Sequence, residues 1–371
     1  MKCRFCNYSS DFNLLVELVN FPKAAQFFLK KEDFNKDKNV TLRVLQCPSC
    51  ELVQLENKPV SYYKNVITAS SLNEESKKEI VREFNIIIKK FKLEKSRTLE
   101  IGSAKGDFLN AISECDISAI GLENSQKNID ASKNKDKIIK GYLLDKLKIK
   151  KKFDFIICNN FLEHQPKIKD FLEKVNSMLS NSGHIYFSVP NLKRIIEKSC
   201  LYEFVTDHLV YFTVKTLKRV FENSGFEVLD CYYKNNENDI VLIGKKRELL
   251  SLRNENKRML IILDSIKKKV NELKRHKNNI SIWGAGHRAL AAMSLANLNN
   301  VDFVVDSAPF KQGLYTPILH KKIISPEDFL KKKCDVIIIM LPGNYANQVT
   351  KFLKTKQFSG KIIAFNDEVI K

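Results

Sequence analysis

The sequence predicts an α/β protein with two units of helices and parallel strands, preceded by a segment of closely spaced cysteines. Three observations support this fold class. Apolar strand-like runs alternate with helical segments from about residue 70 to 247, which is the order of a parallel sheet covered by helices. A second strand–glycine–helix pattern begins near residue 278, and two Cys-x-x-Cys pairs lie within the first 50 residues.

The chain divides into four predicted segments. Residues 1–68 hold the cysteine pairs, and residues 69–247 hold the first alternating block. Residues 248–277 are charged, with apolar residues at helical spacing, which predicts a linking helix with one apolar face. Residues 278–371 form a second, smaller α/β block. The strand candidates are 98–101, 117–122, 153–158, 184–189 and 240–243 in the first block, and 280–283, 301–305, 336–340 and 361–365 in the second.

The composition limits the kind of protein. No apolar run reaches the roughly 18 to 20 residues that a membrane helix needs, and the first residues lack the apolar stretch of a signal peptide. We expect a soluble cytoplasmic protein without membrane contact, whose nine cysteines stay reduced. The net charge is +20, from 63 Lys and Arg against 43 Asp and Glu. Most basic residues are scattered lysines, so a lysine-rich surface is favoured over a nucleic-acid interface.

The cysteine pairs predict a structural zinc site. A spacing of two residues lets one tight turn direct both thiolates at one ion, and two such turns complete a tetrahedral shell of four sulfurs, which suits Zn²⁺. With four thiolates and no open position, the ion would stabilise the segment and take no part in catalysis. The predicted ligands are Cys3, Cys6, Cys47 and Cys50.

Residues 98–109 have the order strand, glycine loop, helix. Gly102 can take backbone angles that other residues avoid, and Gly106 permits close approach of the helix and a ligand. About twenty residues later, a strand candidate ends in Glu123, where a carboxylate can accept both ribose hydroxyls of an adenosine. The strand candidate at 153–158 is followed by polar residues, at the edge where sheets of this type present their ligand.

The acidic residues of this loop favour S-adenosylmethionine (SAM) over a dinucleotide. The loop reads E-x-G-x-x-x-G and lacks G-x-G-x-x-G. A pyrophosphate favours a bare helix N-terminus, whereas SAM has no phosphate and carries a sulfonium and an ammonium group that carboxylates stabilise. A similar α/β core without this cofactor is the remaining alternative. The predicted cofactor-binding residues are Glu100, Gly102, Ser103, Gly106, Glu123, Asn124 and Asn159.

These motifs together resemble the class I SAM-dependent methyltransferases, with E-I-G-S-A-K-G at 100–106, G-L-E at 121–123 and F-D-F-I-I-C-N-N-F-L-E-H at 153–164. The whole-chain order resembles the three-domain sugar C-methyltransferases, which have a four-cysteine zinc domain, a class I core and a second α/β domain. W-G-A-G-H-R-A at 283–289 and K-Q-G-L-Y-T-P at 311–317 carry this resemblance into the last block. It implies a Rossmann-like C-terminal domain and a nucleotide-linked deoxy sugar as substrate.

The resemblance also implies the catalytic residues. The family has a stretch of the type Y-H-E-H-x-x-Y-F-S, and residues 205–213 read V-T-D-H-L-V-Y-F-T. His208 is the expected base, which would deprotonate the carbon beside a ketone so that the enolate attacks the methyl group of SAM. Asp207, which stands where the family has glutamate, is its expected partner in proton transfer. His164 is the second candidate, either as base or as substrate contact.

Other functions remain open at this stage. A sugar O- or N-methyltransferase of the same fold would use His208 to deprotonate an alcohol or amine. A zinc-containing RNA methyltransferase fits the net charge and the cysteine pairs, but the third block argues against it and nucleic acid is not the expected partner. Arg288 and Lys311 are candidate contacts for the diphosphate of a nucleotide sugar. The sequence predicts no particular oligomeric state.

Overall fold

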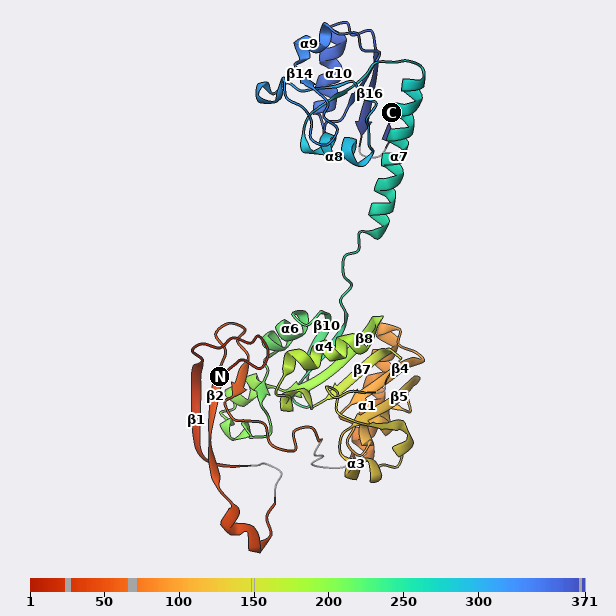
Figure 1. Ribbon diagram of the computed structural model, residues 1–371. Coiled ribbons are helices and arrows are strands. Elements are labelled where there is room, and N and C mark those ends of the chain that lie inside the picture. Colours follow the sequence, from red (N-terminus) through yellow and green to blue (C-terminus); the bar gives the residue numbers. More distant parts are fainter. Residues whose placement is uncertain (24–27, 66–71, 148, 150, 367–368, 371) are drawn as a thin grey trace. The chain divides into compact units, whose positions relative to one another are not determined.

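The computed structural model describes residues 1–23, 28–65, 72–147, 149, 151–366 and 369–370 (Figure 1). The boundary predicted at 68–69 lies outside the described residues. The chain forms two compact units, Met1–Leu249 and Leu250–Lys371. No helix in the described ranges combines the length and apolar character that crossing a membrane requires.

The first unit is built on a seven-stranded sheet in the order β10-β11-β8-β7-β4-β5-β6. All neighbours from β8 to β6 are parallel, and β11 runs antiparallel to both β8 and β10. The strands are β4 (Ser96–Ile101), β5 (Ile117–Glu123), β6 (Ile138–Lys140), β7 (Phe153–Asn159), β8 (Leu179–Pro190), β10 (Phe226–Lys234) and β11 (Asp239–Lys246). The predicted α/β class is confirmed. β11 was expected as a strand at 240–243, but its antiparallel direction and its partner β10 were not predicted.

Helices cover both faces of this sheet. On one face, α1 and α2 pack with Phe155 and Ile157 of β7, and on the other, α4 and α6 pack with Ile156 and Cys158 of the same strand. Alternate residues of a strand point to opposite faces, so the continuous apolar run of β7 is buried on both sides. The helices are α1 (Glu74–Phe91), α2 (Asp107–Ile112), α3 (Gln126–Asp130), α4 (Ile168–Met178), α5 (Leu192–Glu197) and α6 (Val214–Glu222), with short 3₁₀ turns η1 (Lys31–Lys36), η2 (Lys135–Lys137), η3 (Leu162–His164) and η4 (Leu201–Glu203).

The N-terminal segment is built into the same unit. Its strands β1 (Asn13–Pro22), β2 (Asn39–Gln46) and β3 (Val53–Leu55) form an antiparallel sheet that is completed by β9 (Val210–Tyr211), from the far end of the unit's sequence. Cys3, Cys47 and Cys50 are buried in the hydrophobic cluster that also contains α4 and α6. The cysteine segment therefore shares a core with the seven-stranded sheet.

The second unit repeats the parallel α/β design at smaller size. Its strand order is β14-β13-β12-β15-β16-β17, and the pairs from β14 to β16 are parallel. Its elements are α7 (Arg253–Arg275), β12 (Ile280–Trp283), α8 (His287–Leu295), β13 (Phe303–Val305), η5 (Pro309–Lys311), β14 (Ile323–Ile324), α9 (Pro326–Leu330), β15 (Val336–Ile339), α10 (Tyr345–Thr355), β16 (Lys361–Asn366) and β17 (Val369–Ile370). The helix expected at 248–277 thus begins later, and its apolar residues Leu263, Ile266, Val270 and Leu273 pack into this unit's core.

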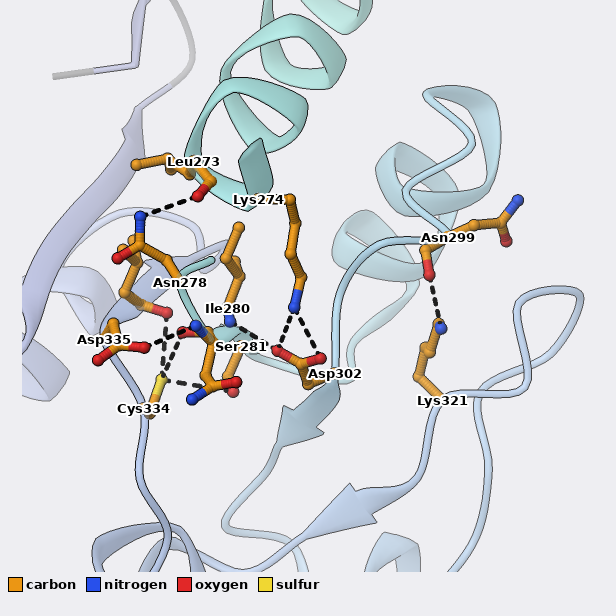
Figure 2. Close-up of polar contacts among 12 residues, drawn as sticks. Leu273, Lys274, Asn278, Ile280, Ser281, Asn299, Asp302, Lys321, Cys334 and Asp335 are labelled. Atoms are coloured by element: carbon orange, nitrogen blue, oxygen red, sulfur yellow. Dashed lines mark hydrogen bonds and ion pairs between the residues drawn. The ribbon is translucent and has the colours of Figure 1, made fainter. Parts of the chain in front are cut away.

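Polar contacts fix the end of α7 to the start of this sheet (Figure 2). The Nζ atom of Lys274 lies 2.7 Å from Oδ2 of Asp302, and the same oxygen accepts a hydrogen bond from the Ile280 amide at 2.7 Å. Asp335 accepts from the Asn279 amide in the same way at 2.7 Å. Two carboxylates thereby accept hydrogen bonds from the first amide of β12 and from the amide just before it, between the helix and the strand.

We predict that Asp302→Ala lowers the free energy of unfolding of the second unit by about 1–2 kcal/mol, because the Ile280 amide and Lys274 lose a shared acceptor. The only tryptophan of the chain is the buried Trp283 of β12, so its fluorescence during denaturant unfolding reports on this unit. Asp264→Ala is the matched control. It removes an exposed ion pair with Lys268 on the same helix and is expected to change stability by less than about 0.5 kcal/mol. Equal effects of the two variants would contradict the prediction.

Candidate active site

A crevice lies at the carboxyl ends of β4, β7 and β8, with a volume of about 360 Å³. The glycine loop after β4 forms one side, with Gly102, Ser103 and Ala104. The polar residues Asn159 and Asn160, at the end of β7, form another part of the wall. Parallel α/β sheets bind ligands at this edge, so the crevice is the candidate cofactor site.

The backbone of the loop requires its glycines. Gly102 and Gly106 have φ angles of 77° and 81°, in the left-handed region where residues with a Cβ are strained. A Cβ at Gly106 would lie 2.9 Å from the Oγ atom of Ser132, so close packing adds to the restriction. Ala104 also has a positive φ of 48°. The loop therefore holds a conformation that is costly for non-glycine residues, as expected where backbone closely approaches a ligand.

Glu100 supplies an unpaired carboxylate oxygen to the crevice. The residue is 2% exposed and lines the cavity, and its Oε2 has no hydrogen-bond partner among the described residues. Burial, followed by the nearby charges of Glu123 and Asp107, raises the pKa of this carboxyl well above its usual value. A cationic ligand would favour the ionised form and supply the missing partner. This orphaned oxygen fits the positive charges of SAM.

Glu123 contacts the loop but does not line the cavity. Its two carboxylate oxygens accept hydrogen bonds from the backbone amides of Ala104 at 2.9 Å and Ser125 at 2.7 Å, and the residue is 1% exposed. Burial raises the pKa of this carboxyl. Each of these oxygens keeps a second lone pair with which it could accept a ribose hydroxyl. That role of Glu123 stays a prediction. Asn124 donates to Asn65 of the N-terminal segment at 2.6 Å and is also outside the cavity lining.

Further residues line the crevice that sequence reasoning missed. Lys234 and Asn235 come from the β10–β11 hairpin, and Asp239 is the first residue of β11. The side-chain Nδ2 atom of Asn160 donates to Oδ1 of Asp239 at 3.3 Å, and this bond connects the hairpin to the end of β7. The Asn-rich stretch 235–238 is the sequence signal that could have indicated this hairpin turn. Three consecutive residues in it, Asn235, Asn236 and Glu237, have positive φ. Asparagine tolerates that conformation, which marks a tight hairpin turn.

The predicted catalytic residues come together beside the end of β7. The rings of His164, on η3, and His208, in the loop before β9, have centroids 4.7 Å apart. The Nδ1 atom of His164 lies 2.8 Å from the carbonyl oxygen of Asp207. The hydroxyl of Tyr62 lies 3.1 Å from each carboxylate oxygen of Asp207, so the N-terminal segment contributes a contact that sequence reasoning missed.

Burial controls the charge state of this cluster. It lowers the pKa of His208 to about 3, with a further contribution from His164, so the imidazole is neutral at physiological pH. Burial likewise lowers the pKa of His164. It raises the pKa of the neighbouring Glu163 to about 8. Two neutral imidazoles with available lone pairs therefore lie next to a buried carboxyl group.

The four cysteines also come together. The Sγ atoms of Cys3 and Cys50 are 3.5 Å apart and those of Cys6 and Cys47 are 3.6 Å apart, and all four lie within 4.8 Å of one another. The residue after each pair, Asn7 and Glu51, has a positive φ of 63° and 65° respectively. The two turns thus have matching backbones that direct their thiols to one point. Four converging thiols form a possible metal site of the kind that zinc prefers.

The second unit repeats the contact between the glycine loop and an acid. The Ala285 amide, after Gly284, donates to Oδ2 of Asp306 at 2.7 Å, as the Ala104 amide does to Glu123. Here, however, Lys311 also binds the carboxylate, with Nζ 3.0 Å from the same oxygen. Lys311 and Arg288 were predicted diphosphate contacts, and Lys311 is at least partly neutralised by this ion pair.

Comparison with known proteins agrees with this geometry. Residues 72–230 match the model of a methyltransferase domain, and residues 248–365 match that of a C-methyltransferase C-terminal domain. The middle of the chain is a SAM-dependent methyltransferase domain. It contains the glycine loop, both histidines and most of the crevice lining, while Lys234, Asn235 and Asp239 follow the matched residues. The predicted second C-terminal domain is confirmed as well.

Individual relatives of the methyltransferase domain cover part of the chain. The ubiquinone biosynthesis O-methyltransferase of Pelagibacter ubique is 31% identical over 121 residues, and this match spans half of that protein. A SAM-dependent methyltransferase from Clostridium acetobutylicum is 12% identical with a TM-score of 0.40, over 48% of this chain and 93% of that one. Magnesium protoporphyrin IX methyltransferase from Synechocystis is 11% identical with a TM-score of 0.39, over 48% of this chain and 90% of that one.

We predict that Glu100 makes the preference of the methyltransferase domain for SAM over S-adenosylhomocysteine depend on pH. As the pH rises, this carboxyl ionises and attracts the sulfonium that only SAM carries, so the ratio of the two affinities increases. Calorimetric titration of both ligands at several pH values measures the ratio. Glu100→Gln should remove the slope, whereas Glu79→Gln, at an exposed residue of the crevice rim, should keep it. The same slope in wild type and Glu100→Gln would refute the role.

Proposed function

We propose that the protein transfers a methyl group from SAM to a carbon atom of a nucleotide-linked keto-deoxysugar. The match of residues 248–365 to a C-methyltransferase C-terminal domain carries the choice of carbon as acceptor. The crevice with Glu100 supports the methyl donor, and the histidine cluster after β7 supports a proton transfer beside it. The sugar and its nucleotide rest on the resemblance of the whole chain to three-domain sugar C-methyltransferases.

The chain's own residues would divide the work as follows. SAM supplies an electrophilic methyl group on its sulfonium. His208, held neutral by burial, would accept a proton from the carbon next to the ketone. The electron pair left on that carbon would then bond to the methyl carbon in line as the bond from methyl to sulfur breaks, which releases S-adenosylhomocysteine. His164 lies against His208, and its bond to the Asp207 carbonyl fixes its ring. Tyr62 holds the Asp207 carboxylate in place.

Methyl transfer can be followed directly with an isotope-labelled methyl donor. The full chain is incubated with a panel of nucleotide-linked 4-keto sugars, the same sugars reduced to alcohols, and RNA. Mass spectrometry detects the transfer, and NMR of the product distinguishes a carbon-bound from an oxygen-bound methyl group. A carbon-bound label on a keto sugar supports the proposal, and label on RNA alone would contradict it.

O-methylation is a second candidate, favoured by the Pelagibacter ubique relative, which is an O-methyltransferase. The cluster fits this reaction too, since a neutral imidazole can accept the proton of a hydroxyl as well as that of an acidic carbon. In the panel above, this function would label the reduced sugars on oxygen.

We predict that His208→Ala lowers kcat by about 10²–10⁴-fold, as expected for loss of a proton acceptor, while the affinity for S-adenosylhomocysteine is unchanged. His208 does not line the crevice, so cofactor binding is the internal control for folding. His276→Ala, at the end of α7, is the control for loss of a histidine away from the site. Full activity of His208→Ala would exclude this residue.

We further propose that the four cysteines hold one structural Zn²⁺. A closed shell of four thiolates leaves no position for substrate, and Cys3, Cys47 and Cys50 lie in the core that the N-terminal segment shares with α4 and α6. Zinc would therefore stabilise the attachment of this segment.

Metal analysis tests this proposal. Purified wild type is expected to contain about one tightly bound zinc per chain. Cys47→Ser should lose this zinc, and the thermal midpoint of its first unit should be lower than that of wild type. Cys200→Ser is the matched control, because Cys200 lies outside the cluster and should leave zinc content unchanged. Normal folding of a metal-free preparation would rule out the structural role.

A further inference from the structure

A second group of side chains that could bind a metal follows the end of β7, whose last residue, Asn159, lines the crevice. One ligand atom from each of Glu163, His164 and His208 falls within 4.8 Å of the other two. Glu163 and His164 come from η3, directly after β7, and His208 comes from the loop before β9. Two imidazoles and one carboxylate on one side of an ion are a set that divalent transition metals accept, with positions left open for other ligands.

One oxygen of the Glu163 carboxyl group lacks a partner. Glu163 is 1% exposed, and its Oε2 makes no hydrogen bond within the part of the chain that the structure describes. Nor does any lysine or arginine among those residues form an ion pair with it. An unpaired buried carboxylate oxygen is costly, and a carboxylate oxygen of Glu163 lies within 4.8 Å of a ring nitrogen of each histidine.

The hydrogen bonds around the group are those of a metal site. The Nδ1–H of His164 donates to the Asp207 carbonyl oxygen at 2.8 Å, which assigns the proton to Nδ1 and leaves the Nε2 lone pair available. Metal-binding histidines commonly donate their other ring nitrogen to a carbonyl or carboxylate in this way. Within the described residues, neither ring nitrogen of His208 has a hydrogen-bond partner.

Backbone contacts hold the three ligands in register. The Leu209 amide donates to the Glu163 carbonyl oxygen at 2.8 Å, so the loop that carries His208 is attached to the turn that carries the other two residues. The pairing of β3 with β9 fixes the far end of the same loop. The group is therefore assembled before any ion binds, which lowers the entropic cost of binding.

We infer that Glu163, His164 and His208 bind a divalent first-row transition ion such as Mn²⁺ or Zn²⁺. The nitrogen ligands favour such ions over Mg²⁺, which prefers oxygen. The open positions of the ion would take oxygen atoms of the substrate, where the positive charge stabilises the negative charge that develops on a deprotonated keto sugar or hydroxyl. This role rests on the proposed function, because that function places the substrate here.

The ion and the proton compete for His208. An imidazole nitrogen that binds a metal has no lone pair left for a proton, so the general-base role would pass to hydroxide on the ion. That hydroxide takes the substrate proton and becomes bound water, while the electron pair stays on the substrate. Metal binding and methyl transfer therefore give independent readouts: a metal-free enzyme that remains active leaves the proposed function intact and overturns the inference.

Titration of the full chain with Mn²⁺ alone tests the site. Electron paramagnetic resonance measures the free ion, and Mn²⁺ binds poorly to the soft thiolates of the cysteine cluster, so that cluster does not interfere. We expect one Mn²⁺ per chain at this group. Glu163→Gln should weaken the affinity at least about tenfold, and Glu197→Gln, an exposed carboxylate on α5, should not change it.

Binding of S-adenosylhomocysteine checks that each variant is folded. If Glu163→Gln fails this check, His164→Asn decides, since it keeps a polar side chain and removes a ligand of the proposed ion. Saturable binding that these variants weaken supports the site. Absence of saturable Mn²⁺ binding to wild type, binding that both variants leave unchanged, or full methyl transfer after dialysis against a chelator would overturn it.

Discussion

The chemistry of the first unit depends on a carboxyl group that is removed from water without a partner. Glu100 ends the central strand β4, where the sheet opens into the crevice, and desolvation there disfavours its negative charge. A protein gains nothing in stability from such an arrangement, so the orphaned oxygen indicates a ligand with positive charge. The glycine loop beside it is consistent with this, because its left-handed backbone at Gly102 and Gly106 permits close approach to a bound molecule.

Local sequence was sufficient to predict much of the fold. The strands β4, β5, β7 and β8 were expected within a few residues of their observed bounds, because each is an apolar run between turn residues. The hairpin of β10 and β11 was predicted only in part. Residues 226–234 read F-E-V-L-D-C-Y-Y-K, and the charged residues Glu227 and Asp230 interrupt the continuous apolar pattern that the central strands have. Their strand character depends on pairing with β11, which sequence reasoning does not see.

The site residues, like the strands, could be predicted only where the local sequence carries the pattern. The glycine loop and the cysteine pairs carry their spacing in the sequence, so their members could be named. Asp239, Lys234 and Tyr62 could not, since they reach the site through the β10–β11 hairpin and the N-terminal segment. Glu163 stands beside His164 in the sequence, but no residue pattern there indicates that it is buried. Only the fold shows that it is buried and faces two histidines.

The sheet β1-β2-β3-β9 has a consequence for the order in which the chain can fold. Val53 pairs with Tyr211, so an early strand waits for a partner that emerges from the ribosome much later. Until then, the edge of β3 is unpaired and the cysteine turns lack the core of α4 and α6 that covers them. The N-terminal segment therefore cannot complete its sheet before residues 210–211 have been synthesised, and the histidine loop, which carries β9, is attached in the same step.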